Sequence, residues 1–141
     1  MPKQKVVIFE GVDKSGKTTL KDHFNRQTNY KYWVLDRSFV SSLVYSKLFE
    51  RNDEEYWMNV AKDFCSTYDV YFVYCHSSEQ VVRQRLEHAN ETLPEKLQNI
   101  VEVCKLFIKY LDEIHARYLT INTEDNIDVC TANIKQFLED K

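Results

Sequence analysis

The residues best suited to chemistry form one run near the start of the chain, Gly11-Val-Asp-Lys-Ser-Gly-Lys-Thr18. The run has the spacing of a phosphate-binding loop: a glycine, four residues, then glycine, lysine and a hydroxyl residue. In such a loop the backbone N–H groups surround a polyphosphate, the lysine reaches its terminal phosphates and the hydroxyl binds magnesium. The chain has two glycines, and both fall where this pattern requires one. A simple turn would need neither Lys17 nor Thr18, so the pattern favours phosphate binding.

The predicted ligands of this loop are ATP and Mg²⁺. An apolar run precedes the loop and an amphipathic segment follows it, which is the strand–loop–helix context that the pattern needs. We expect the ATP phosphates to lie against Gly11, Val12, Asp13, Lys14, Ser15, Gly16, Lys17, Thr18 and Thr19. We also expect the Lys17 side chain to be exposed while the loop is empty.

A carboxylate follows the next apolar run. Residues 30–35 are expected to form a strand, and Asp36 and Arg37 come directly after it. Ligands of open α/β sheets bind at the carboxyl ends of the strands, so Asp36 would lie beside the phosphate loop. A carboxylate there can hold Mg²⁺ through water. The alternative is a cap or turn residue before a helix at Ser38. We favour the metal role, with Thr18 as the second predicted ligand.

The elements that must position these residues alternate along the chain. Short apolar runs predict strands at residues 5–10, 30–35, 69–75 and 118–121. Apolar residues at helical spacing predict helices at 17–25, 38–51 and 54–65, after Ser78, from Leu97 to Ile114, and at 127–138. In the third helix Tyr56, Trp57, Val60 and Phe64 form an apolar stripe, more typical of core than of a base-stacking platform. Strands separated by helices imply parallel pairing, so we predict a three-layer α/β fold of about four parallel strands, in one domain spanning residues 1–141.

Composition limits the function classes. A chain of 141 residues with 43% apolar and 29% charged residues is typical of one globular domain. The net charge of −3 disfavours stably held DNA or RNA, which needs a basic face, but not a single nucleotide. The four cysteines are widely spaced and predict neither a zinc site nor a disulfide framework. No apolar run approaches the length of a membrane span, and we expect a cytoplasmic protein.

Three segments resemble the thymidylate kinase family. The run from Phe9 to Thr19 looks like that family's phosphate loop, including Asp13 and a basic residue, Lys14, after it. Residues 36–45 resemble its Asp-Arg-Tyr segment, and Arg85-Leu86 is similar to the arginine that leads into its lid. The resemblance implies a P-loop NTPase (Walker A) kinase fold. It also implies a deoxynucleoside monophosphate kinase, which converts ATP and a dNMP to ADP and a dNDP.

The same resemblance implies a role for each matching residue. Asp13 would contact the acceptor sugar, and Lys14 and Arg37 would hold the acceptor phosphate or the one in transfer. Asp36 would hold magnesium, Arg85 would stack on adenine, and residues 122–126 would border that base. The implied catalytic residues are Lys17, Asp36, Arg37, Asp13 and Lys14. A homodimer and a viral or phage source, acting in the host cytoplasm, are compatible with the resemblance.

The acceptor side departs from the family. Only eighteen residues separate Lys17 from Asp36, where family members have a further strand and the helices that shape the thymine pocket. The lid, residues 87–94, is short and lacks the usual arginines. The sequence therefore leaves two alternatives to a small nucleotide acceptor. One is a kinase for a hydroxyl of a nucleoside or of a modified base or end in DNA. The other is a nucleotide-binding or hydrolysing module without transfer, which would need neither Asp13, Lys14 nor Arg37.

Overall fold

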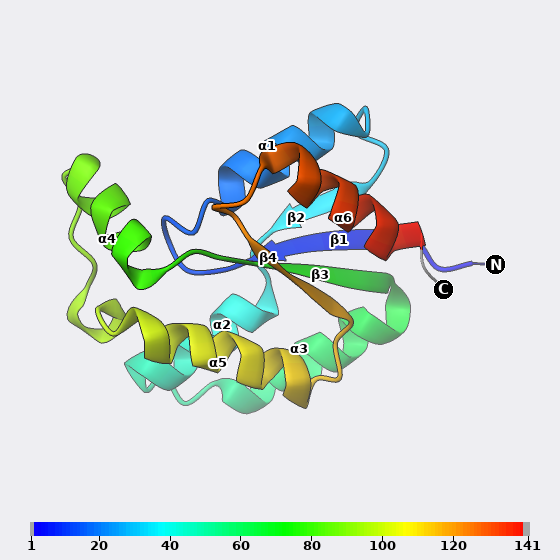
Figure 1. Ribbon diagram of the computed structural model, residues 1–141. Coiled ribbons are helices and arrows are strands. Elements are labelled where there is room, and N and C mark those ends of the chain that lie inside the picture. The colour runs from blue at the N-terminus through cyan, green and yellow to red at the C-terminus, as the bar shows by residue number, and fades with distance from the viewer. Residues whose placement is uncertain (1, 140–141) are drawn as a thin grey trace.

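A parallel four-stranded sheet forms the centre of the molecule, with helices on both faces (Figure 1). The structure is a computed structural model and describes residues 2–139. The strands are β1 (Lys5–Glu10), β2 (Trp33–Asp36), β3 (Asp69–His76) and β4 (Tyr118–Asn122), in the spatial order β2-β1-β3-β4. All three neighbouring pairs are parallel, which confirms the predicted α/β fold of four strands.

Each face of the sheet has its own core, because successive side chains of a strand point to opposite faces. On one face Ile8, Phe72 and their neighbours are buried under α2 (Phe39–Phe49), α3 (Glu54–Thr67) and α5 (Ile100–Glu113). On the other face Phe9 and Val73 are buried under α1 (Lys17–Gln27) and α6 (Ile127–Glu139).

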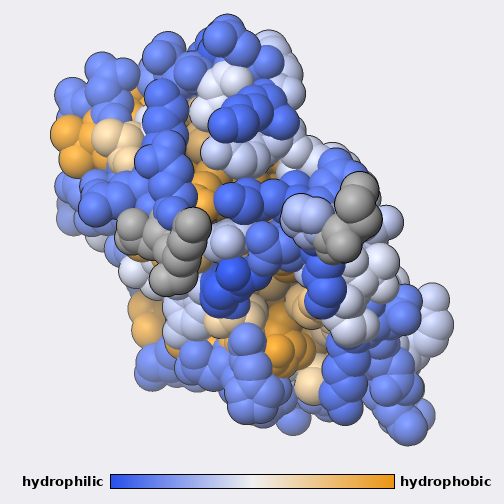
Figure 2. All heavy atoms as spheres, turned by 90° about the vertical axis from the view of Figure 1, so that its right-hand side faces the viewer, coloured by the Kyte–Doolittle hydropathy of each residue, from blue (hydrophilic) through white to orange (hydrophobic). Residues whose placement is uncertain are grey.

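The fourth helix, α4 (Glu79–His88), stands beyond the carboxyl ends of the strands, and the short 3₁₀ turn η1 (Glu95–Leu97) connects it to α5. Figure 1 shows α4 at the end of the sheet opposite the chain termini. The face on the right-hand side of Figure 1 is mostly hydrophilic, with smaller patches of apolar residues among the polar ones (Figure 2). No helix within residues 2–139 is long and apolar enough to cross a membrane.

Two predicted boundaries were wrong. The second strand begins at Trp33 rather than Tyr30, because Asn29 and Tyr30 adopt left-handed φ values of 52° and 56° and turn the chain. The longest predicted helix begins at Ile100 rather than Leu97. Asn99 caps this helix by accepting a hydrogen bond from the Glu102 N–H at 3.3 Å, so the residues before it form a separate turn.

The expected apolar stripe of α3 is also only partly correct. Trp57, Val60 and Phe64 pack against the core, as expected. Tyr56, in contrast, is 61% exposed. Its side chain extends from the first turn of the helix into solvent, and Trp57 is the first of these residues to pack against the core.

The helix that follows the phosphate loop is anchored by Phe24. This side chain is fully buried, and its ring lies 5.8 Å from that of Phe9 on β1 and 5.7 Å from that of Tyr32. Phe24 therefore fixes α1 to the strand that carries the loop.

We expect Phe24→Ala to lower the free energy of unfolding by about 3–5 kcal/mol, because it leaves a cavity between α1 and β1. Urea denaturation followed by circular dichroism measures the change. The control is Tyr30→Ala, at an aromatic residue that is 69% exposed, where a change of less than about 1 kcal/mol is expected. Equal losses in both variants would contradict the anchoring role.

Candidate active site

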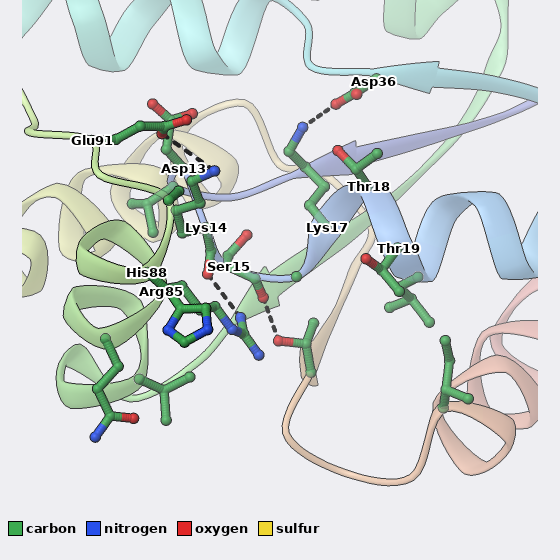
Figure 3. A pocket seen from close by; sticks show the side chains of 18 of the residues that line it. Asp13, Lys14, Ser15, Lys17, Thr18, Thr19, Asp36, Arg85, His88 and Glu91 are labelled. Atoms are coloured by element: carbon green, nitrogen blue, oxygen red, sulfur yellow. Dashed lines mark hydrogen bonds and ion pairs between the residues drawn. The ribbon is translucent and has the colours of Figure 1, made fainter.

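A cavity of about 1100 Å³ opens at the carboxyl ends of the strands, beside the predicted phosphate loop (Figure 3). Its walls are the loop itself, Asp36 at the end of β2 with Arg37 after it, one side of α4, and the region from Thr123 into α6. Pockets for a single small ligand usually measure roughly 300–1,000 Å³. The cavity is therefore large enough for a nucleotide together with a second small molecule.

The phosphate loop passes close to the end of β3 and to the loop after β4, and this explains its two glycines. Gly11 has a φ of 150°, and a Cβ there would lie 2.5 Å from the Cys75 carbonyl oxygen. Gly16 has a φ of 87°, and a Cβ there would lie 2.7 Å from Thr123 Oγ1. Neither position accepts a larger residue without movement of the end of β3 or of the loop after β4.

Hydrogen bonds from the same two segments hold the loop backbone. The Ser15 carbonyl accepts a hydrogen bond from Ser77 Oγ at 3.0 Å and another from the Thr123 hydroxyl. Arg85 Nη1 donates to the Lys14 carbonyl at 2.8 Å and to Ser77 Oγ at 3.0 Å. Arg85 thus lines the cavity and also supports the loop. Its stacking on adenine stays a prediction.

Three cations of the site each contact a carboxylate. Lys17 pairs with Asp36, Arg37 with Asp13, and Lys14 with Glu91, the last with 3.2 Å between Nζ and Oε2. Figure 3 shows the Lys17–Asp36 and Lys14–Glu91 pairs as dashed lines. The expectation of an exposed Lys17 was wrong, since its side chain is only 7% exposed. Its pairing with Asp36 holds the ammonium group over the loop.

Thr18 and Asp36 fit a magnesium site. Both line the cavity, and they offer a hydroxyl and a carboxylate oxygen, the hard donors that Mg²⁺ prefers. This ion usually keeps several waters and is held by one or two carboxylates together with substrate phosphates. One carboxylate beside a phosphate loop matches that arrangement.

Arg37 connects the loop to α2. Its Nη1 donates to the Gly11 carbonyl at 3.2 Å and to the Tyr45 hydroxyl at 3.1 Å, and its Nη2 contacts Asp13. The Arg37 backbone has a φ of 70°, in the left-handed region. A non-glycine residue there is uncommon and costs about 1–3 kcal/mol unless its surroundings compensate.

Glu10, the last residue of β1, is a fully buried carboxyl group behind the loop. Its Oε2 accepts hydrogen bonds from Ser38 Oγ at 2.7 Å and from the Ser41 N–H at 3.2 Å. Its Oε1 accepts one from Ser41 Oγ at 2.6 Å. Burial raises the pKa of Glu10, although the hydrogen bonds from Ser41 and Ser38 oppose that shift.

Sequence reasoning missed several residues of the site. Glu10 could have been suspected, because it is a charged residue at the end of a continuous apolar run. Tyr45 lies in the segment 36–45 and His88 and Glu91 lie in the lid 87–94, but the sequence assigned none of them a role. His88 and Glu91 line the cavity, and Tyr45 binds Arg37. Arg83, two residues before Arg85 on α4, bonds instead to Glu79 and to the Gln98 carbonyl.

The loop expected to border adenine contributes one residue to the cavity wall. Of residues 122–126 only Thr123 lines the cavity, and Ile127 and Cys130 of α6 follow it. Asn122 and Asn126 use their side chains locally: their Oδ1 atoms accept hydrogen bonds from the N–H groups of Glu124 and Asp128, each at 2.9 Å. These asparagines shape the turn.

Solved structures share this fold, although no family model and no curated protein matches the sequence. The chain resembles the YorR protein from Bacillus subtilis, determined in complex with phosphorylated GDP. Their TM-score is 0.67 at 18% identity, over 95% of each chain. It also resembles deoxyadenosine kinase from M. mycoides with bound dCTP, with a TM-score of 0.66 at 12% identity, over 96% of this chain and 98% of that one. For the same kinase with bound dATP the TM-score is 0.65 at 11% identity, over 97% and 100%.

These similarities define the architecture as the P-loop kinase fold. The α/β fold expected from the order of elements and the kinase fold implied by the family resemblance are both confirmed.

We expect Glu10→Gln to change how stability depends on pH. A carboxyl group with a raised folded-state pKa stabilises the protein below its ordinary pKa of 4.5, and this contribution is lost as the pH rises through the folded-state value. Glutamine does not titrate, so the stability of Glu10→Gln relative to wild type should increase from about pH 4 to about pH 8. Urea unfolding at several pH values measures it. A constant stability difference between Glu10→Gln and wild type over this pH range would remove Glu10 as the cause.

Proposed function

We propose that this protein is an ATP- and Mg²⁺-dependent phosphotransferase acting on a small acceptor of the nucleoside or nucleoside monophosphate class. The observation that carries the proposal is one cavity lined by the phosphate loop, by Lys17 and Asp36, and by Arg37 with Asp13. The phosphate loop with Lys17 and Asp36 suits a nucleoside triphosphate. Arg37 and Asp13 extend the site beyond what nucleotide binding alone would need. The similar solved structures support it, because the deoxyadenosine kinase among them was determined with bound deoxynucleotides.

The chain's own groups would act by position and charge. The loop N–H groups and the N-terminus of α1 would bind the phosphates of ATP, and Lys17 would follow the phosphoryl group in transfer. Thr18 and Asp36 would hold Mg²⁺, which supplies neutralisation of the charge on the phosphate oxygens. The Lys17 ammonium, which pairs with Asp36 in the structure, would exchange that carboxylate for a phosphate oxygen when ATP binds. Arg85, which lines the same cavity, would stack on the adenine base of ATP.

A deoxynucleoside monophosphate, with dTMP as the first candidate, is the acceptor that the thymidylate kinase-like motifs favour. Its phosphate would bind Arg37 and Lys14, and Asp13 would be released to contact the sugar. This requires the phosphate to replace Asp13 at Arg37 and Glu91 at Lys14, since both cations contact those carboxylates in the structure.

A nucleoside hydroxyl is the second candidate acceptor, and the carboxylates favour it. Asp13 and Glu91 face the cavity beside Arg37 and Lys14, so they would repel an acceptor phosphate. A carboxylate at that position can instead receive the proton of an attacking hydroxyl group. The deoxyadenosine kinase among the similar structures supports this candidate by its name.

One experiment decides between these acceptors. The protein is incubated with γ-labelled ATP and Mg²⁺ in the presence of deoxynucleoside monophosphates, deoxynucleosides or DNA, and the labelled products are separated. Label on dTMP or another monophosphate supports the first candidate, and label on a nucleoside supports the second. Label retained on DNA would identify a polymer acceptor. Label found only as free phosphate with every acceptor would overturn the proposal.

We expect Lys17→Met to reduce phosphoryl transfer at least about 100-fold, because it removes the cation closest to the transferred group while retaining the buried stem. Initial rates with the best acceptor of the panel measure the loss. Lys21→Met, on the same helix but outside the cavity, should retain wild-type rates. Thermal unfolding of both variants separates loss of chemistry from loss of fold. Wild-type turnover in Lys17→Met would remove the loop from the reaction.

A further inference from the structure

We propose that Glu10 is a positioning residue, which holds Arg37 in the orientation that faces the acceptor. The inference rests on the proposed function, because Arg37 is the side chain proposed to meet the acceptor there. Glu10 touches neither the cavity nor a substrate group, and it would act through α2 and the segment after β2.

The first support is the hydrogen bonding at the start of α2. Ser38 is the N-cap of this helix, and its Oγ accepts from the Val40 N–H at 3.2 Å while donating to Glu10 Oε2. The Ser41 N–H, which has no partner within the helix, donates to the same Glu10 oxygen. Glu10 therefore completes the cap of α2 from a neighbouring strand, and its negative charge would lie at the favourable end of the helix dipole.

The second support is the left-handed backbone of Arg37. Such a conformation persists only when the surrounding structure holds it. The Arg37 N–H donates to the Phe9 carbonyl at 2.9 Å, which fixes one side of the residue. On the other side Ser38 is fixed by the Glu10 carboxyl group. Adjacent residues of β1 thus hold both sides of Arg37.

The third support is a direct link to the guanidinium group. Ser41 Oγ donates to Glu10 Oε1 and lies 3.4 Å from Arg37 Nη1. The same Nη1 donates to the carbonyl of Gly11, the residue after Glu10. The guanidinium is therefore held against the first residue of the phosphate loop, which fixes its distance from the transferred phosphate.

Filling the space at the end of β1 would not require a carboxyl group. Glu10 is the last residue of a strand whose preceding residues, Val6 to Phe9, are all fully buried, and an apolar side chain could fill its place. A buried carboxyl group costs free energy unless its oxygens are paired. All the hydrogen bonds of this carboxyl group go to the segment that carries Arg37, which points to positioning.

The test compares Glu10→Met, which keeps the size but removes both acceptor oxygens, with Glu10→Gln, which keeps one. We expect Glu10→Met to lower kcat/KM for the acceptor about 10–100-fold, because small displacements of a positioning group have effects of that size. The KM for ATP should stay within about threefold, and Glu10→Gln should restore most of the lost rate. An equal loss in both acceptor and ATP parameters would overturn the positioning role.

A double-mutant cycle with Arg37→Ala tests whether Glu10 acts through Arg37. We expect Glu10→Met to lower the rate no further once Arg37 is absent. A loss in the Arg37→Ala background as large as in the wild type would contradict the proposal. Ser41→Ala is the second variant in case Glu10→Met does not fold, and it should show a smaller loss of the same kind. Ser42→Ala, at the next residue of α2, is its matched control and should behave as wild type.

A readout without catalysis separates this proposal from the proposed function. If the wild-type protein transfers phosphate to no acceptor, the proposed function fails. Hydrogen exchange at the Arg37 backbone N–H, which donates to the Phe9 carbonyl, then decides the positioning role and is followed by ¹⁵N NMR. We expect slow exchange in the wild type and in Ser42→Ala, and faster exchange in Glu10→Met and Ser41→Ala. Unchanged exchange in the last two variants would overturn the proposal.

Discussion

The narrow passage of the phosphate loop between the end of β3 and the loop after β4 is the constraint on which the site depends. It requires glycine at two positions, since a side chain at Gly11 would meet the Cys75 carbonyl and one at Gly16 would meet Thr123. The same passage lets Ser77 and Thr123 bind the backbone of the loop, and Arg85 supports it from α4. Strands β1, β3 and β4 must therefore be in register before the loop can take its shape. The conformation of the loop therefore depends on the parallel sheet, whose strand ends supply these contacts.

The basic side chains of the site are paired with carboxylates, and binding of a phosphate would replace those partners. Each of the three side chains Lys14, Lys17 and Arg37 contacts a carboxylate, so none is an isolated buried charge. A phosphate can take the place of a carboxylate at such a cation, and a metal ion can take the place of a cation at such a carboxylate. The donor side has the parts for both exchanges. Where we propose that the acceptor binds, Lys14 and Arg37 are matched by Glu91 and Asp13, and for this reason we propose both a monophosphate and a hydroxyl as acceptors.

Sequence reasoning predicted what depends on local spacing. The phosphate loop follows from glycine, lysine and threonine at fixed intervals, and Asp36 follows from its place after an apolar strand. The structure brings these together in one cavity. Sequence reasoning could not predict the partners of Glu10. Ser38 and Ser41 lie 28 and 31 residues away along the chain, and a buried glutamate has no periodic signal. The same holds for Glu91, which reaches Lys14 only through the fold of the segment after α4. The late start of α5 depends on the Asn99 cap, whereas the apolar spacing extends back to Leu97.

The pairing of charges in the cavity also bears on how a nucleotide would arrive. The walls carry four basic side chains, Lys14, Lys17, Arg37 and Arg85, and three acidic ones, Asp13, Asp36 and Glu91. A cavity so close to neutral, in a chain of net charge −3, produces little long-range attraction for a polyanion. Encounter with ATP would then proceed by unassisted diffusion, and its rate would change little with ionic strength. Selectivity for phosphate would arise only after contact, when a phosphate group replaces the carboxylate partner of a cation in the cavity.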